Sequence, residues 1–341
     1  MFQLLTNLST TLLLLIAIIL GSLTGVFLPD QAEVISSSVD PLILILVSLL
    51  FFEISIVRIK EARQHLRFLS LAWVTNFILI PLIGWAIASL FLSGQPLLFI
   101  GLLIYFIAPC TDWFLGFTRL AKGNVTLGSV LLPINLISQL LLFPIFLGFF
   151  AGKNAGIEIA DISSTLWQWF FVPFLGAITL HEVLKRILPA SIFKRLLQLV
   201  NAFVPIVIAA LVTCICSGNI NTIIENGSAF LIILIAVFVF FLATYFLGEF
   251  ISQRFQLHYR EHVLLTMTTA ARNAPLMLGL TTAAFPDQPL IYSALIIGML
   301  VEFPHLTALK HILLRRQLST HLTKKSPSAV TLTKSAHITT P

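Results

Sequence analysis

Two segments of the sequence place a proline close to a charge within otherwise apolar runs. The first contains Pro109 and Asp112, and the second contains Arg272 and Pro275. A proline leaves the carbonyl four residues before it without a helical partner, so each helix should kink or break there. If these runs cross a membrane, the freed backbone groups require protein or a wet cavity to satisfy them. We therefore expect breaks at Pro109 and Pro275 to mark a solute site, the alternative being two simple proline kinks.

Asp112 and Arg272 are the most informative charges, because a charge at mid-membrane costs about 2.5–3.5 kcal/mol on insertion scales. We hypothesise that they approach each other where the broken helices cross. The pair would be either a structural ion pair or a site for solute binding or proton coupling. Thr111 can cap the helix that follows it, whose positive dipole end favours an anionic group.

The thiol of Cys110 directly follows Pro109. A helix amino terminus lowers the pKa of a nearby thiol, and a thiolate suits a soft, thiophilic solute. A free cysteine is usually a small, buried apolar packing residue. Both interpretations stay open for Cys110, whereas Cys214 and Cys216 are interpreted as packing residues. The cysteine and histidine spacings favour neither a disulfide nor a metal site, and no cofactor is predicted.

Other polar residues lie inside apolar runs. Asn135 and Gln139 are four apart and share a helix face, Asn273 follows Arg272, and Glu302 lies in the last run. Hydrogen bonds between helices explain most such residues, but an ionisable group such as Glu302 is also a candidate for binding or coupling. The candidate site residues are Cys110, Thr111, Asp112, Asn135, Gln139, Arg272, Asn273 and Glu302.

The composition predicts an integral membrane protein. Of 341 residues, 58% are hydrophobic and 10% are charged, against roughly 25% charged in a soluble domain. Apolar runs of about twenty residues, each able to cross a membrane, recur along the chain. The predicted spans are Leu8 to Leu28, Val39 to Val57, Phe68 to Leu92, Leu97 to Thr118, Val125 to Phe150, Ser164 to Leu180, Leu196 to Ser217, Ala229 to Ile251, Val263 to Ala284 and Pro289 to Leu314.

The basic residues predict the orientation of these spans. With the amino terminus in the cytoplasm, 18 of the 20 Lys and Arg fall on the cytoplasmic side, Lys153 falls outside and Arg272 falls within a span. This follows the positive-inside rule. We expect a multi-pass protein of the inner (plasma) membrane, surrounded by lipid, with both termini in the cytoplasm. The spread of charge over alternate loops excludes a nucleic-acid-binding domain.

The spans form two sets of five. Residues 1–314 are predicted to be one transmembrane domain with repeats at about 8–150 and 164–314, and 315–341 a disordered cytoplasmic tail. Because five is odd, two homologous halves would lie in opposite orientations, as in many secondary transporters. The predicted fold is therefore all-α, with about ten transmembrane helices and broken fourth and ninth helices. The absence of HExxH, GxSxG and paired catalytic aspartates argues against an intramembrane enzyme. A sensory or structural membrane protein is a further alternative, but it would not require paired breaks.

A family resemblance rests on several motifs. The run Ala108-Pro109-Cys110-Thr111, followed by residues 120–124 and the span carrying Asn135, resembles the fourth and fifth helices of arsenite permeases. These belong to the bile acid:sodium symporter superfamily. The third span, with Asn76-Phe77, and the ninth also look like that superfamily. The resemblance implies two inverted five-helix repeats with crossing broken helices, and it matches Cys110 to a cysteine thought essential in arsenite exporters.

Two departures from the family pattern affect the expected coupling ion. Bile acid symporters carry a sodium-liganding Glu and a Gln in helix nine, where this chain has Thr269 and Arg272-Asn273. Arsenite exporters carry a Glu where this chain has Pro275. We therefore expect the Arg272 guanidinium to stand where a cation would bind, with proton coupling through Asp112. The leading hypothesis is export of arsenite or a related small solute, and the alternative is sodium-coupled import of an organic anion.

Overall fold

The computed structural model describes residues 2–52, 65–111, 113–150, 171–285 and 288–324. The regular secondary structure in these segments is helical, and the only pairing of extended backbone among them is one isolated bridge between Pro109 and Arg272. The prediction of an all-α protein is confirmed for the described part of the chain.

The helices of the first half follow the predicted spans closely. They are α1 (Phe2–Phe27), α2 (Pro29–Ser36), α3 (Val39–Phe52), α4 (Leu66–Val74), α5 (Ile80–Leu92), α6 (Pro96–Ile107), α7 (Trp113–Leu120) and α8 (Val125–Phe150). A π-helical turn, η2 (Thr75–Leu79), joins α4 to α5. The short helix α2 was not predicted. The fourth predicted span is divided into α6 and α7, as expected of a broken helix.

The helices of the second half also overlap the predicted spans, but several are longer than predicted. They are α11 (Val172–Ile187), α12 (Ala190–Glu225), α13 (Gly227–Arg254), α14 (Tyr259–Ala270), α15 (Ala274–Ala284) and α16 (Pro289–Lys324). The ninth predicted span is divided into α14 and α15. α16 continues to Lys324, so the first part of the segment predicted to be a tail is helical. Residues 325–341 lie outside the described residues.

Several helices are suited to a membrane. Among the described residues, five helices are long and apolar enough to cross one, and the number is six if the bent pair α2 and α3 counts as one span. α6 and α15 are apolar but short, because each is one part of a broken span. Many large apolar side chains on α1, α11, α12 and α13 are exposed, as expected of helices that face lipid. The chain is therefore a multi-pass helical membrane protein.

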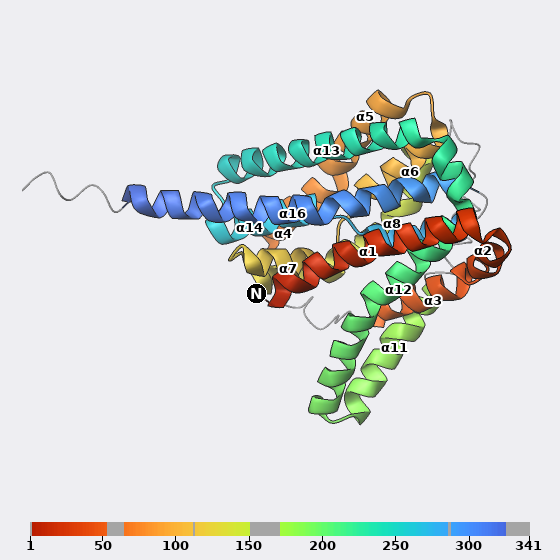
Figure 1. The fold of residues 1–341 in the computed structure, drawn as a ribbon. Helices are drawn as coiled ribbons and strands as arrows, with labels where there is room; N and C mark the ends of the chain where they lie inside the picture. Colours follow the sequence, from red (N-terminus) through yellow and green to blue (C-terminus); the bar gives the residue numbers. More distant parts are fainter. Residues whose placement is uncertain (1, 53–64, 112, 151–170, 286–287, 325–341) are drawn as a thin grey trace, which may run out of the picture.

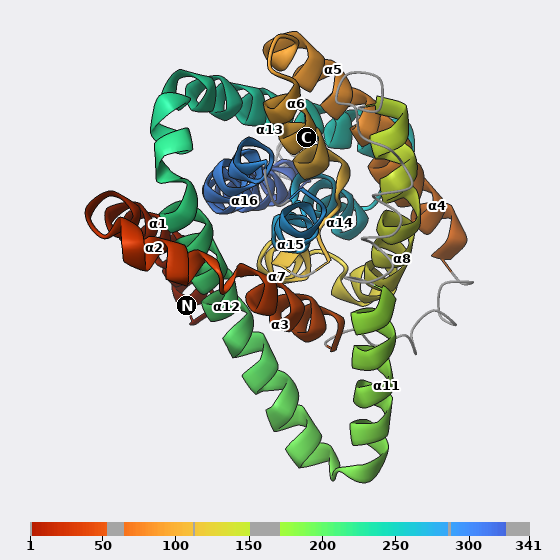
Figure 2. The same cartoon turned by 90° about the vertical axis from the view of Figure 1, so that its right-hand side faces the viewer.

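The helices form two groups. α1 packs along α12, and α3 contacts both α11 and α12. Figure 1 shows α11 and the first part of α12 diverging from the bundle as a hairpin, which appears as a V in Figure 2. In the other group, α6 packs on α5 and α16, and α13 packs on α5, α14 and α16. α7 and α15 also contact α16, so α16 lies beside all four helix segments that flank the two breaks.

Close backbone approach fixes α6 against α16. A Cβ atom on Gly101 would lie 2.1 Å from the carbonyl oxygen of Ile291, and one on Gly298 would lie 2.7 Å from the Tyr105 ring. Only glycine permits either contact. These contacts hold Tyr105 of α6 and Glu302 of α16 in a fixed relation.

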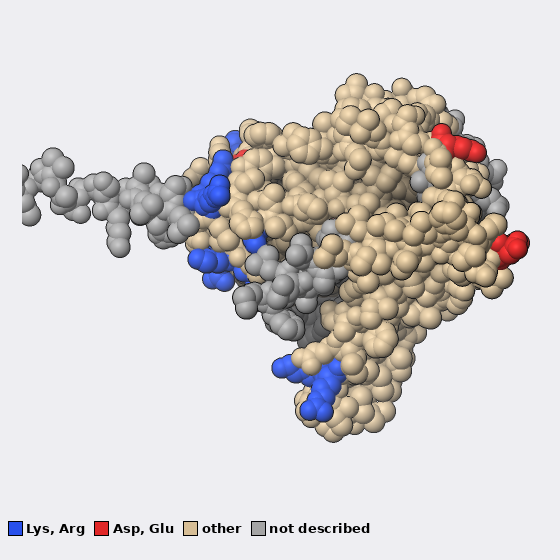
Figure 3. All heavy atoms as spheres, viewed as in Figure 1, with Lys and Arg blue, Asp and Glu red and all other residues tan. Residues whose placement is uncertain are grey.

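Charge is distributed unevenly over the surface. On the face shown in Figure 3, Lys and Arg gather at one end of the bundle and on the α11–α12 hairpin, while most of the visible Asp and Glu lie at the opposite end. The last turn of α11 carries Lys185 and Arg186. The surface between the charged ends is uncharged on this face, as expected of a belt that contacts lipid.

Candidate functional site

The two breaks pair with each other. The first lies between Ile107 and Trp113 and the second between Ala270 and Ala274. The amide of Cys110 donates to the carbonyl of Ala271 at 3.0 Å, and the amide of Asn273 donates to the carbonyl of Ala108 at 2.9 Å. Pro109 and Arg272 lie opposite each other in an antiparallel bridge. Backbone groups that the breaks expose are thus satisfied by the other break, as apolar surroundings require.

The two prolines have different positions relative to the breaks. Pro109 lies inside the first break. Pro275 lies in the first turn of α15, where a helix needs no amide donor. The carbonyl of Ala271 is freed from its own helix, as the sequence predicts for a residue four before Pro275. Its partner is the Cys110 amide, a contact that local sequence reasoning cannot supply.

The side chain of Arg272 is fully buried and bonds to backbone carbonyls. Nη1 donates to the carbonyl of Phe106 at 2.8 Å, and Nη2 donates to those of Thr268 at 3.1 Å and Thr269 at 2.6 Å. The guanidinium also lies 5.7 Å from the centre of the Phe240 ring, a cation–π arrangement. Asp112 lies outside the described residues, so its predicted pairing with Arg272 stays a prediction.

Glu302 connects α16 to both breaks. Its Oε1 accepts hydrogen bonds from the Trp113 indole at 2.8 Å and from the Arg272 backbone amide at 2.9 Å. Its Oε2 accepts one from the Tyr105 hydroxyl at 3.3 Å. The carboxylate is completely buried, and three elements besides α16 converge on it. This arrangement satisfies a buried carboxylate with donors from α6, α7 and the second break.

Amide side chains form a polar cluster beside the crossing. The side-chain amides of Asn76 and Asn135 both donate to the Thr268 hydroxyl, at 3.2 and 3.1 Å. Asn76 lies in the π-helical turn η2, an element often found at functional sites. Pro81 follows this turn and has no amide hydrogen, so the carbonyl of Phe77 lacks its usual helical donor. Spans three and five therefore contribute polar groups next to the second break.

The amide of Asn273 extends this cluster to the first break. Its Nδ2 donates to the Thr111 hydroxyl at 3.1 Å and to Gln139 Oε1 at 3.5 Å. Three candidate site residues, Thr111, Gln139 and Asn273, are thus brought together. All are buried, as are Cys110 and Asn135.

The cluster retains unused hydrogen-bonding capacity. The buried atoms without a partner are Asn76 Oδ1, Asn135 Oδ1, Asn273 Oδ1 and Gln139 Nε2. Buried polar atoms nearly always have a partner, so a group of four without one calls for a ligand or water. Three acceptors and one donor would suit a small polar solute that carries hydroxyl groups.

Sequence reasoning missed part of the site. Asn76, Tyr105, Trp113 and Thr268 each bond to a candidate site residue or to its partner. The sequence identifies Asn76 as part of a family motif but not as a site residue. The position of Trp113 next to Asp112 could have indicated Trp113. Nothing in the local sequence distinguishes Thr268 from neighbouring threonines.

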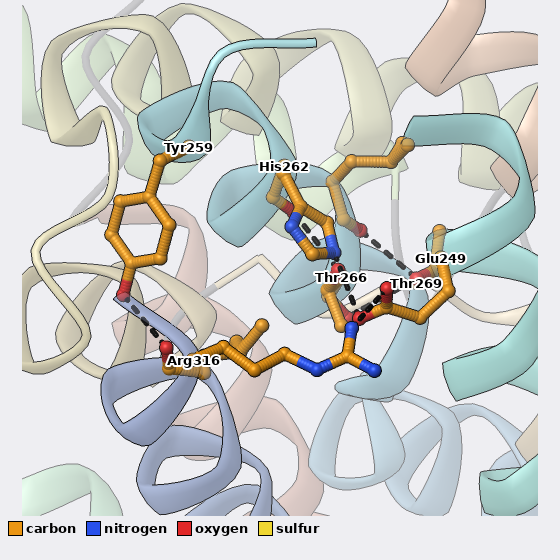
Figure 4. Close-up of polar contacts among 8 residues, drawn as sticks. Glu249, Tyr259, His262, Thr266, Thr269 and Arg316 are labelled. Carbon is orange, nitrogen blue, oxygen red and sulfur yellow. Dashed lines mark hydrogen bonds and ion pairs between the residues drawn. The ribbon is translucent and has the colours of Figure 1, made fainter. Parts of the chain in front are cut away.

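A second polar cluster lies away from the crossing, between the end of α13, the start of α14 and α16 (Figure 4). Glu249 forms an ion pair with Arg316, and its Oε1 lies 3.3 Å from His262 Nε2. A cavity of about 470 Å³ opens beside these residues. Burial lowers the pKa of His262. His258 caps α14 together with Glu261. Among the described residues, no three His, Cys, Asp or Glu are grouped to hold a metal ion.

Comparison with known proteins identifies the class of protein. A family model described as "Sodium Bile acid symporter family" matches residues 41–226, which is more than half of the chain. The chain belongs to this family of membrane transporters. This confirms the family resemblance predicted from the motifs around Cys110.

Two relatives are similar over most of the chain. The "Arsenical-resistance protein Acr3" of Corynebacterium glutamicum is 25% identical over 291 residues, which cover 80% of this chain and 78% of that protein. An uncharacterized protein of Bacillus subtilis, YbaS, is 22% identical over 244 residues, or 72% of this chain and 78% of its own length. Each similarity thus covers more than two thirds of both chains.

Proposed function

We propose that this protein is a secondary transporter that exports arsenite or a related small hydroxylated solute. The observation that carries the proposal is the group of unpartnered buried amide atoms beside the paired breaks, close in the fold to Cys110. The three amide oxygens would accept hydrogen bonds from a solute's hydroxyl groups. The thiol would provide a soft ligand for arsenic. Similarity to an arsenical-resistance protein supports the same solute.

The proposed architecture has ten spans. The spans would form two inverted repeats, about 8–150 and 164–314, within one transporter domain covering 1–314, followed by a cytoplasmic tail. Support comes from the matching division of spans four and nine and from the symmetric pairing of Ala108 and Cys110 with Asn273 and Ala271. The 18 Lys and Arg predicted on one side support cytoplasmic termini in the inner membrane.

Proton coupling is the proposed source of energy, with Asp112 as the group that takes up and releases the proton. The alternative is a sodium-coupled symporter of organic anions. The contacts of Arg272 argue against this alternative, because both Nη atoms already bond to carbonyls. An anion would have to displace these bonds to reach the guanidinium.

The test is transport in everted membrane vesicles. Arsenite uptake by the wild-type protein should be stimulated by a pH gradient that is acidic inside. Cys110→Ser, nearly isosteric, should abolish uptake without lowering protein abundance, whereas Cys214→Ser should retain it. Wild-type vesicles that take up a bile-acid-like anion with sodium, and no arsenite, would refute the proposal. Full arsenite uptake by Cys110→Ser would show that Cys110 is a packing residue and not a ligand.

A further inference from the structure

The carboxyl ends of two half-helices face the guanidinium of Arg272. α6 ends at Ile107 and α14 ends at Ala270, so the carbonyls of Phe106, Thr268 and Thr269 belong to the last turns of these helices. Such carbonyls lack intrahelical donors and carry the negative end of the helix dipole. In transporters with broken helices, carbonyls of this kind coordinate a coupling cation.

The guanidinium meets all three carbonyls. Nη1 bonds to the carbonyl of one half-helix and Nη2 to two carbonyls of the other, at distances between 2.6 and 3.1 Å. A planar fork with several donors can bridge two helix ends in this way, whereas a single ammonium group cannot. The positive charge therefore occupies the position that the two negative helix ends define.

The surroundings complete a site for a cation. The Phe240 ring lies 5.7 Å from the guanidinium carbon. The carboxyl group of Glu302 accepts a hydrogen bond from the backbone amide of Arg272 at 2.9 Å, which places its acceptor oxygens nearby. Arg272 is completely buried, and its Nε has no hydrogen-bond partner. Two helix ends, an aromatic face and a carboxylate thus surround one positive charge that cannot leave.

We propose that Arg272 is a covalently attached cation that replaces a mobile sodium ion where the half-helices cross, so that transport does not require sodium. This inference rests on the proposed transport function and specifies its coupling. The tethered charge holds the ends of α6 and α14 together permanently, as a bound ion would do only transiently. A proton, and not a metal ion, then remains as the coupling partner.

The first experiment compares cations in the wild-type protein. Arsenite flux into proteoliposomes is measured in sodium, potassium or choline chloride of equal ionic strength, with the same pH gradient. Equal flux in all three salts is expected. Flux that falls about tenfold when choline replaces sodium would overturn the proposal.

The second experiment removes the tethered charge. Arg272→Ala leaves three carbonyls and a carboxylate around an empty space, so millimolar guanidinium chloride or sodium chloride should bind there. The melting temperature of the purified variant should rise saturably with either salt and not with choline chloride. The wild-type protein and Arg119→Ala, which makes the same change on the exposed side of α7, should show no such rise. Flux by Arg272→Ala should be low in choline and recover at least partly in guanidinium.

The outcomes separate two questions. If Arg272→Ala shows no saturable stabilisation by either cation, or yields no folded protein in any of the salts, the site cannot accept a mobile cation and the inference is refuted. Arg272→Lys is expected to fold without added cation, because it retains the charge near at least one helix end. If wild-type proteoliposomes move no arsenite, the proposed function fails, while the melting measurements still decide whether Arg272 occupies a cation site.

Discussion

Replacing Glu302 tests whether one carboxylate joins α16 to both breaks. Glu302→Gln and Glu302→Leu both remove the charge and nearly preserve the volume, so their difference isolates the hydrogen bonds. A glutamine placed with its oxygen at Oε1 still accepts from the Trp113 indole and the Arg272 amide. Its NH₂ group would then face the Tyr105 hydroxyl, which can accept. A leucine accepts from none of them.

The expected difference follows from the donors left unpaired. The Arg272 amide is completely buried, and an unsatisfied buried donor costs about 1–3 kcal/mol. The Trp113 indole is only partly buried, so its loss should cost about 1 kcal/mol, near the lower limit. The Tyr105 hydroxyl keeps a second partner, the carbonyl of Gly298 at 3.1 Å, and adds little. Glu302→Leu should therefore be less stable than Glu302→Gln by about 2–4 kcal/mol.

Equilibrium unfolding in mixed micelles, followed by tryptophan fluorescence, measures this difference. Ser293→Ala, on the same helix but bonded only within it, serves as the control and should change stability little. Equal stability of Glu302→Leu and Glu302→Gln would show that the donors find other partners, and the reasoning would be wrong.

Three further predictions concern packing, pH and topology. Gly101→Ala should destabilise the fold by about 1–3 kcal/mol by overpacking, because its Cβ would meet the Ile291 carbonyl. The control is Gly116→Ala, whose Cβ would meet nothing within 4 Å. This control should be neutral or stabilising in the same unfolding assay. Burial lowers the pKa of His262 below its usual 6.5, so the unfolded chain binds the proton more readily. Stability should fall as pH drops below about 6.5, and His262→Gln should flatten that fall; an unchanged pH profile would contradict the assignment. Cysteines introduced at Lys194 and Lys153 should react with impermeant reagents from opposite sides of the membrane, and labelling from one side would refute the ten-span topology.

Local sequence signals predicted the breaks but not their partners. The fifth predicted span and α8 share the same limits, Val125 and Phe150, because hydrophobicity and length are local properties. The proline at 109 likewise indicated an interruption inside an apolar run. The pairing of Cys110 with Ala271 depends on how two distant helices cross, and no local pattern encodes that geometry.

The partners of the charged residues show the same limit. Sequence reasoning sought a carboxylate for Arg272, but the described bonds of its guanidinium go to carbonyls, two of them only three and four residues earlier. Every helix ends in carbonyls that lack helical donors. Whether a side chain bonds to these carbonyls depends on the direction in which that side chain points. Glu302 receives donors 189 and 197 residues away, from α7 and α6, so this convergence is visible only in the folded structure.

The mutual pairing of the breaks has a consequence for biogenesis. Thr111 and Asn273 are separated by 162 residues, and at ~5–20 residues per second a ribosome needs roughly 8–30 s to synthesise that interval. During this time the amide of Cys110 and the carbonyl of Ala108 have no access to their final partners, and each unpaired group costs several kcal/mol in hydrocarbon. We therefore expect the fourth predicted span to reach its final depth only after the ninth predicted span has been made. Insertion of the first half is provisional, and the newly made chain depends on water, lipid headgroups or the insertion machinery to hold that segment until its complement emerges.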